Sequence, residues 1–357
     1  MSPFRSRPWT GGRSFGWSAS WLPLAVAVLA LNGCGGKQDG LDTKGMVYGG
    51  SSPTVSPAGP VASTHYSGMG ISVAPEIAPA ANAATHDIRL DVTHEVIQVA
   101  DSVRYQAWTF GGVVPGPVIH IRQGDRVNFT LTNRSDQAIP LTPPMPHSMD
   151  FHAAMVNPLD KYQSVGPGAQ LRYEWVANYP GVFMYHCATP PVLQHIASGM
   201  FGMVIVDPKG GYPTHADREY ALVESELYLS KSRTRAEMID MKAALQKTPT
   251  YVVFNGKPQR HVAEPLKAKP GERVRLYVLD VGPNGTSSFH VIGTILDRVW
   301  LDGDPANELR GMQTVLIPAS GAAICEFVIP EAGIYTFVDH EFADCEMGAM
   351  GHISALP

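Results

Sequence analysis

The sequence predicts an all-β protein built from two β-sandwich domains in tandem, residues 86–210 and 211–357. Short runs of alternating apolar and polar residues, separated by Gly/Pro turns, begin near His86 and are typical of a sandwich. A weak internal repeat of roughly 150 residues indicates a second copy of the same unit. The repeated pieces are Gly124-Asp125 and Pro180-Gly181-Val182-Phe183 in the first half, and Pro270-Gly271-Glu272 and Ala332-Gly333-Ile334-Tyr335 in the second.

Length and charge limit the classes of function. The chain has 357 residues, enough for two domains with full cores. Charged residues make up 17% and the formal net charge is −5. Because no cluster of Lys and Arg with interleaved aromatic residues is present, we expect no nucleic-acid partner.

Residues 1–34 have the features of an export signal. Arginines precede an apolar run, Trp21 to Leu31, that is too short to cross a bilayer. The run ends in Leu31-Asn32-Gly33-Cys34, which resembles the lipobox of bacterial lipoproteins. We expect export to the periplasm with a lipid anchor on Cys34, and export without lipidation is the alternative.

Composition and periodicity predict the other elements. Residues 35–85 are rich in Gly, Ser, Pro and Ala and are expected to form a flexible linker. A helical pattern over Arg233 to Gln246 predicts a helix between the domains. The candidate strands of the first domain are Asp87–Val99, Val118–Ile121, Val127–Leu131, Leu171–Trp175 and Phe201–Val206.

The segment 185–200 carries the most specific signal. Cys187, His195 and Met200 lie in it and His147 precedes it, which gives the trigonal His₂Cys set with a weak axial Met that binds an electron-transfer copper. Alone, Cys or Met would more often be a core residue. The four ligands together favour a copper site.

A second metal is indicated on the opposite face. His186 precedes Cys187, and adjacent side chains of a strand point to opposite sides. The same argument sends His147 and His152 to opposite faces, so His152 joins His186. A three-His site with an open fourth position needs one more imidazole. The candidates in the second domain are His340 and His290.

Two cysteines remain outside the leader and the metal site. Cys325 and Cys345 lie in the second domain. An oxidising compartment could join them in a disulfide, and two buried free thiols are the alternative.

These motifs resemble those of the two-domain copper nitrite reductases, over residues 86–357. The resemblance rests on residues 147–154, 185–188, 195–200, 289–293 and 338–340. It implies two cupredoxin-like Greek-key domains and two coppers per chain. The implied type 1 ligands are His147, Cys187, His195 and Met200, and the implied type 2 ligands are His152, His186 and His340. Asp150 and His290 would handle protons, and Ile292 would shape the substrate pocket.

The resemblance also implies the reaction and the partners. Nitrite would be reduced to nitric oxide at the type 2 copper, with the electron relayed from the type 1 copper through Cys187 and His186. A small blue copper protein or a cytochrome c would donate the electron. The third type 2 ligand comes from a neighbouring subunit in this family, so a homotrimer is expected.

Two other readings compete with this one. A two-domain oxidase would reduce dioxygen, but its trinuclear centre needs paired His-x-His ligands, and the pairs are broken around His152 and His186. A membrane-tethered electron carrier without catalysis would need the type 1 copper alone. This alternative gives no role to His152, His186 and His340.

Overall fold

The computed structural model describes residues 51–57, 71–72, 75–137, 142–230 and 236–356. The predicted signal peptide and Cys34 lie outside these residues. Within the described part, no helix is both long and apolar enough to cross a membrane.

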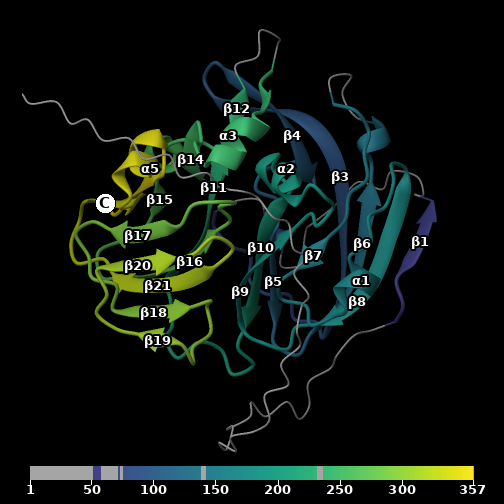
Figure 1. The fold of residues 1–357 in the computed structure, drawn as a ribbon. Coiled ribbons are helices and arrows are strands. Elements are labelled where there is room, and N and C mark those ends of the chain that lie inside the picture. Colours follow the sequence, from purple (N-terminus) through teal and green to yellow (C-terminus); the bar gives the residue numbers. More distant parts are fainter. Residues whose placement is uncertain (1–50, 58–70, 73–74, 138–141, 231–235, 357) are drawn as a thin grey trace, which may run out of the picture. The chain divides into compact units, whose positions relative to one another are not determined.

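The first sandwich consists of two five-stranded sheets (Figure 1). One sheet has the order β1 (Thr54–Pro57), β8 (Ala169–Val176), β6 (Arg126–Asn133), β3 (Thr85–Ala100) and β4 (Val103–Phe110). The other has the order β2 (Ile71–Ser72), β5 (Val118–Arg122), β10 (Phe201–Asp207), β9 (Gly181–His186) and β7 (Asp150–Phe151). The short helices of the first sandwich are η1 (Ser135–Gln137), α1 (Pro158–Lys161) and α2 (Val192–Ala197). Alternate residues of β3, among them Ile88, Leu90 and Val92, are fully buried in the core between the sheets.

The second sandwich repeats this plan. One sheet has the order β14 (Tyr251–Phe254), β11 (Arg218–Leu227), β16 (Arg273–Asp280), β21 (Ala322–Val328), β18 (Arg298–Leu301) and β19 (Glu308–Leu309). The other has the order β15 (Leu266–Lys267), β23 (Met350–Ser354), β22 (Ile334–Asp339), β17 (Ser287–Val291) and β20 (Thr314–Ile317). Helices α4 (Arg260–Ala263) and α5 (Phe342–Met347) complete it. The predicted fold class, two tandem sandwiches, is confirmed.

An apolar interface joins the two sandwiches. Met184 and Met203, on β9 and β10, share one buried cluster with Val223, Tyr277 and Trp300 of the sheet that contains β11 and β16. The outer face of one sheet therefore packs on the outer face of the next. This explains why β10 is apolar on both faces rather than alternating.

Part of the predicted linker is folded onto the first domain. Strand β1 pairs antiparallel with β8, and Ile77 and Ala80 are each only 9% exposed. The Ala78 carbonyl accepts a hydrogen bond from His120 Nδ1 at 2.7 Å. The composition argument failed here because backbone pairing to a sheet edge orders a segment whose own side chains bury little surface.

The predicted helix between the domains, Arg233 to Gln246, begins later than expected among the described residues, and residues 233–235 of it lie outside them. Helix α3 spans Met241–Gln246, and Met238–Ile239 instead forms strand β13, which pairs with β12 (Leu229–Ser230). Asp240 sets the start of the helix: its backbone is extended, and its side chain caps the helix by accepting a hydrogen bond from Ala243 N at 3.0 Å.

The two cysteines of the second domain do not form a disulfide in this structure. Cys325 and Cys345 are buried free thiols.

Candidate metal centres

The first ligand cluster forms where strand β9 ends. Cys187 follows β9 directly, His195 lies on α2, and His147 is held by an isolated bridge to Val165. All three ligand residues are fully buried. Cys187 Sγ lies 3.2 Å from His195 Nδ1 and 3.9 Å from His147 Nδ1, and the two Nδ1 atoms are 3.2 Å apart.

These distances fit a trigonal metal. Metal–nitrogen bonds of about 2.0 Å and metal–sulfur bonds of about 2.3 Å in one plane separate the donor atoms by roughly 3.5 to 3.7 Å. Met200 is fully buried beside the cluster: its carbonyl accepts from Cys187 N at 3.1 Å and its amide donates to the His195 carbonyl at 3.2 Å. The chemistry of this donor set, one thiol, two imidazoles and a nearby thioether, suits copper.

Burial prepares the imidazoles of the cluster as ligands. Desolvation lowers the pKa of His147 to about 2 and that of His195 to about 4, so both rings are neutral at physiological pH. Burial raises the pKa of the Cys187 thiol, and hydrogen bonds from Ser148 oppose that shift. The Ser148 amide lies 3.4 Å from the sulfur. A metal would therefore displace a proton from Cys187 on binding.

The second cluster contains Asp150, His152 and His186. Strand β7 pairs with β9 so that Asp150 lies opposite His186, and the turn after β7 carries His152. The Nε2 atoms of His152 and His186 are 3.1 Å apart, and Asp150 Oδ2 lies 3.7 Å from His186 Nε2. Because His186 Nδ1 bonds the Cys187 carbonyl at 3.0 Å, its Nε2 is the atom available to a metal.

The second domain supplies a separate pair of histidines. His290 lies on β17 and His340 follows β22, with ring centroids 5.2 Å apart. Asp339 fixes this strand end, because its Oδ1 accepts from the amides of Ser288 and Glu341 at 2.9 Å each. His340 is exposed, and Ile292, two residues beyond His290, is 49% exposed.

The predicted site residues therefore fall into three groups. His147, Cys187 and His195 come together with Met200 beside them, whereas Asp150, His152 and His186 form a group of their own. Within one chain, the described residues do not place His340 among the ligand atoms of that second group. His340, His290 and Ile292 form the third group and lie in the second domain.

One residue at the first cluster was missed from the sequence. His94, on β3, places its Nε2 3.0 Å from His147 Nε2 and stacks on Trp108. Burial lowers the pKa of His94 to about 4. The two histidines are 53 residues apart, so no ligand spacing could have connected them.

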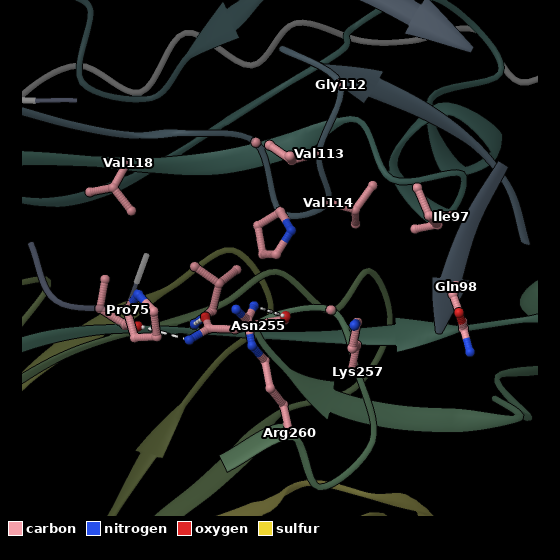
Figure 2. A pocket seen from close by; sticks show the side chains of 15 residues that line it. Pro75, Ile97, Gln98, Gly112, Val113, Val114, Val118, Asn255, Lys257 and Arg260 are labelled. Atoms are coloured by element: carbon pink, nitrogen blue, oxygen red, sulfur yellow. Dashed lines mark hydrogen bonds between the residues drawn. The ribbon is translucent and has the colours of Figure 1, made fainter. Parts of the chain in front are cut away.

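A cleft of about 470 Å³ lies between the loops that follow β4 and β14 (Figure 2). Its walls include Val114, Asn255 and Lys257, and Arg260 is tied to the Asn255 carbonyl at 3.0 Å. The residues that line it include no His, Cys, Asp or Glu. The cleft therefore offers none of the metal-ligand types used by the two clusters.

Comparison with known proteins supplies the family context. A family profile described as multicopper oxidase matches residues 91–211. The copper-containing nitrite reductase of Neisseria meningitidis serogroup A is 38% identical over 293 residues, which cover 78% of this chain and 72% of that protein. The enzyme of the same name from Pseudomonas chlororaphis is 34% identical, covering 70% and 72%. A solved structure, copper nitrite reductase from Nitrosomonas europaea, aligns with a TM-score of 0.69 and 39% identity, covering 76% and 93%.

Proposed function

Because this chain belongs to the copper-containing nitrite reductases, a family of oxidoreductases, we propose that it reduces nitrite to nitric oxide with two coppers per chain. One observation carries the proposal: consecutive residues, Cys187 and His186, belong to two different ligand clusters. With copper bound at both clusters, an electron held at the first would reach the second through one peptide unit. A carrier protein would have no use for such a link.

The ligand chemistry divides into two roles. We assign the type 1 site to His147, Cys187, His195 and Met200, since thiolate and thioether ligands suit a copper that only exchanges electrons. The type 2 site would use three imidazoles, which leave a position open for substrate. Its ligands are His152 and His186 of one chain and His340 of a neighbouring copy. Copper, when bound, supplies one-electron storage at the first site and a Lewis acid for nitrite at the second.

A homotrimer would complete the type 2 site, because the described part of one chain does not bring His340 to His152 and His186. The face around His340 supports this assembly. Phe342, whose ring lies 4.9 Å from that of His340, is 61% exposed, and Leu316 is 64% exposed. Large apolar side chains beside a half-complete ligand set are expected where another copy packs.

Two side chains would handle the protons. Nitrite takes up one electron and two protons to give nitric oxide and water. Asp150, partly buried and 3.7 Å from His186 Nε2, is placed to pass a proton to a substrate oxygen at the type 2 site. His290, whose ring centroid lies 5.2 Å from that of His340, is the second proton donor. Ile292 would form the apolar wall that limits water around the substrate.

The remaining expectations concern the cell. We propose that the protein is exported to the periplasm and held at the membrane by a lipid on Cys34. The electron donor would be a small blue copper protein or a cytochrome c. The mild net charge of −5 is compatible with either donor.

The test is anaerobic nitric oxide release, measured by electrode from copper-loaded protein given nitrite and a reduced mediator. Copper per chain is determined on the same sample. Nitric oxide formed at two coppers per chain is the expected result. No nitric oxide with both coppers bound would contradict the proposal, and dioxygen consumption would then identify the protein as an oxidase. One copper per chain and no turnover would instead identify a carrier.

A further inference from the structure

His94 makes an unusual contact with a proposed copper ligand. Its Nε2 lies 3.0 Å from His147 Nε2, the ring nitrogen that points away from Cys187. His94 is 3% exposed and stacks on Trp108, with ring centroids 5.3 Å apart and an interplanar angle of 18°. Trp108 in turn packs its ring against His195, with centroids 4.9 Å apart.

The protons of this pair follow from the ligand geometry. His147 faces Cys187 and His195 through Nδ1, so a metal there leaves the hydrogen on His147 Nε2. That N–H points at His94 Nε2, which must then accept it. The contact with His147 Nε2 is the side-chain hydrogen bond of His94, and the backbone of Thr142 also interacts with this ring.

We infer that His94 is a positioning residue, which accepts the Nε2–H of His147 and thereby sets the orientation of this ligand and the reduction potential of the copper. Metal-binding histidines usually donate this hydrogen to a carboxylate, a backbone carbonyl or water. A stacked imidazole is a fixed acceptor that water cannot replace. The inference rests on the proposed copper at the first cluster.

The physical consequence concerns the two oxidation states. A hydrogen-bond acceptor at Nε2–H makes the imidazole of His147 a stronger electron donor. A stronger donor stabilises bound Cu(II) more than bound Cu(I). Removing the acceptor should weaken Cu(II) binding more than Cu(I) binding and raise the reduction potential. Each tenfold loss of relative Cu(II) affinity corresponds to 59 mV for one electron.

Three variants of His94 separate the hydrogen bond from packing. His94→Phe keeps a ring against Trp108 without an acceptor, and His94→Gln keeps an acceptor near the position of Nε2. His94→Asn carries the same amide one bond shorter, so it cannot reach His147. The control is His86→Gln, on the same strand, where a buried histidine bonds Asp125 at 2.7 Å and contacts no ligand.

The measurements are the visible absorption band, Cu(II) affinity and a redox titration of the copper-loaded protein. We expect the Phe and Asn variants to lose about 10- to 100-fold in Cu(II) affinity and to show a raised potential. The Gln variant and the control should match the wild type. If Phe does not fold, the Asn and Gln pair decides.

Three results would overturn the inference. Unchanged potentials in the Phe and Asn variants would remove His94 from this role. An equal shift in the Gln variant or in the His86 control would assign the effect to packing. A wild-type protein without a visible copper band would overturn the copper site itself, and the inference with it.

Discussion

His186 and Cys187 are consecutive residues whose side chains belong to different ligand clusters. His186 Nε2 lies 3.1 Å from His152 Nε2, whereas Cys187 Sγ lies 3.2 Å from His195 Nδ1. The opposite directions follow from the pleat at the end of β9, where successive side chains point to opposite faces. One peptide unit therefore links a buried thiol cluster to a cluster that reaches the surface.

Replacing His340 should remove one of the two proposed coppers and leave the other in place. In His340→Ala the type 2 copper should be lost, because two imidazoles remain where three are needed, while the visible type 1 band stays. Copper analysis and absorption spectra measure both. His215→Ala, at a histidine whose side chain is 89% exposed, is the control and should keep two coppers per chain. Loss of the visible band in His340→Ala would show that the ligands are divided incorrectly.

Asp150→Asn should leave both coppers bound and slow nitrite turnover by roughly 10²- to 10⁴-fold, the usual worth of a positioned proton donor. The amide keeps the shape of the carboxyl group but cannot carry the proton. Asp101→Asn, in the exposed turn between β3 and β4, is the control and should turn over normally. A near-normal rate in Asp150→Asn would exclude this carboxylate from the reaction.

A group of buried and half-buried carboxyls should make the second domain less stable as pH rises. Burial raises the pKa of Glu224 and Asp280 well above the usual range, and that of Asp344 to about 6. The folded state therefore binds more protons than the unfolded state. From about pH 4 upward, the free energy of unfolding should fall by up to about 1.4 kcal/mol per pH unit for each such group.

Urea unfolding at pH 5 and pH 8 tests this pH dependence. In Glu224→Gln, the free energy of unfolding should change less between pH 5 and pH 8 than it does in the wild type. Glu272→Gln is the control: Arg218 lowers the pKa of Glu272, so the stability from this pair is lost only at pH values below the ordinary glutamate pKa, and the change in free energy of unfolding between pH 5 and pH 8 should match that of the wild type. Equal pH profiles for wild type and Glu224→Gln would contradict the prediction.

Gly202 faces a ring beside the metal clusters. It pairs with Tyr185 across β9 and β10, and a Cβ at this position would lie 2.3 Å from the Tyr185 ring. Tyr185 is fully buried, so Gly202→Ala should lower the free energy of unfolding by about 1 to 3 kcal/mol. Thermal unfolding measures it against Gly210→Ala, where a Cβ meets nothing within 4 Å. Equal melting temperatures for Gly202→Ala and Gly210→Ala would mean that the Tyr185 ring moves aside at no cost in free energy.

Much of the fold was predictable because it is local. The alternation of apolar residues in strands such as β3 and β6 reflects the pleat, and the repeated turn motifs indicate the second sandwich. Two predictions failed at the margins. Composition does not reveal that a sheet edge will pair with Thr54–Pro57, and a helical pattern does not reveal that Asp240 will cap the helix late.

The sequence by itself determined which candidate ligand types are present and that His186 and Cys187 point to opposite faces, because residues a few positions apart on one strand and loop have their faces fixed by backbone geometry. Only the tertiary structure placed His94 against His147 and grouped the carboxyls of Glu224, Asp280 and Asp339, because these contacts join strands distant in the chain. It also left His340 apart from His152 within one chain. Strand pairing and sheet packing, which depend on the whole core, decide such contacts.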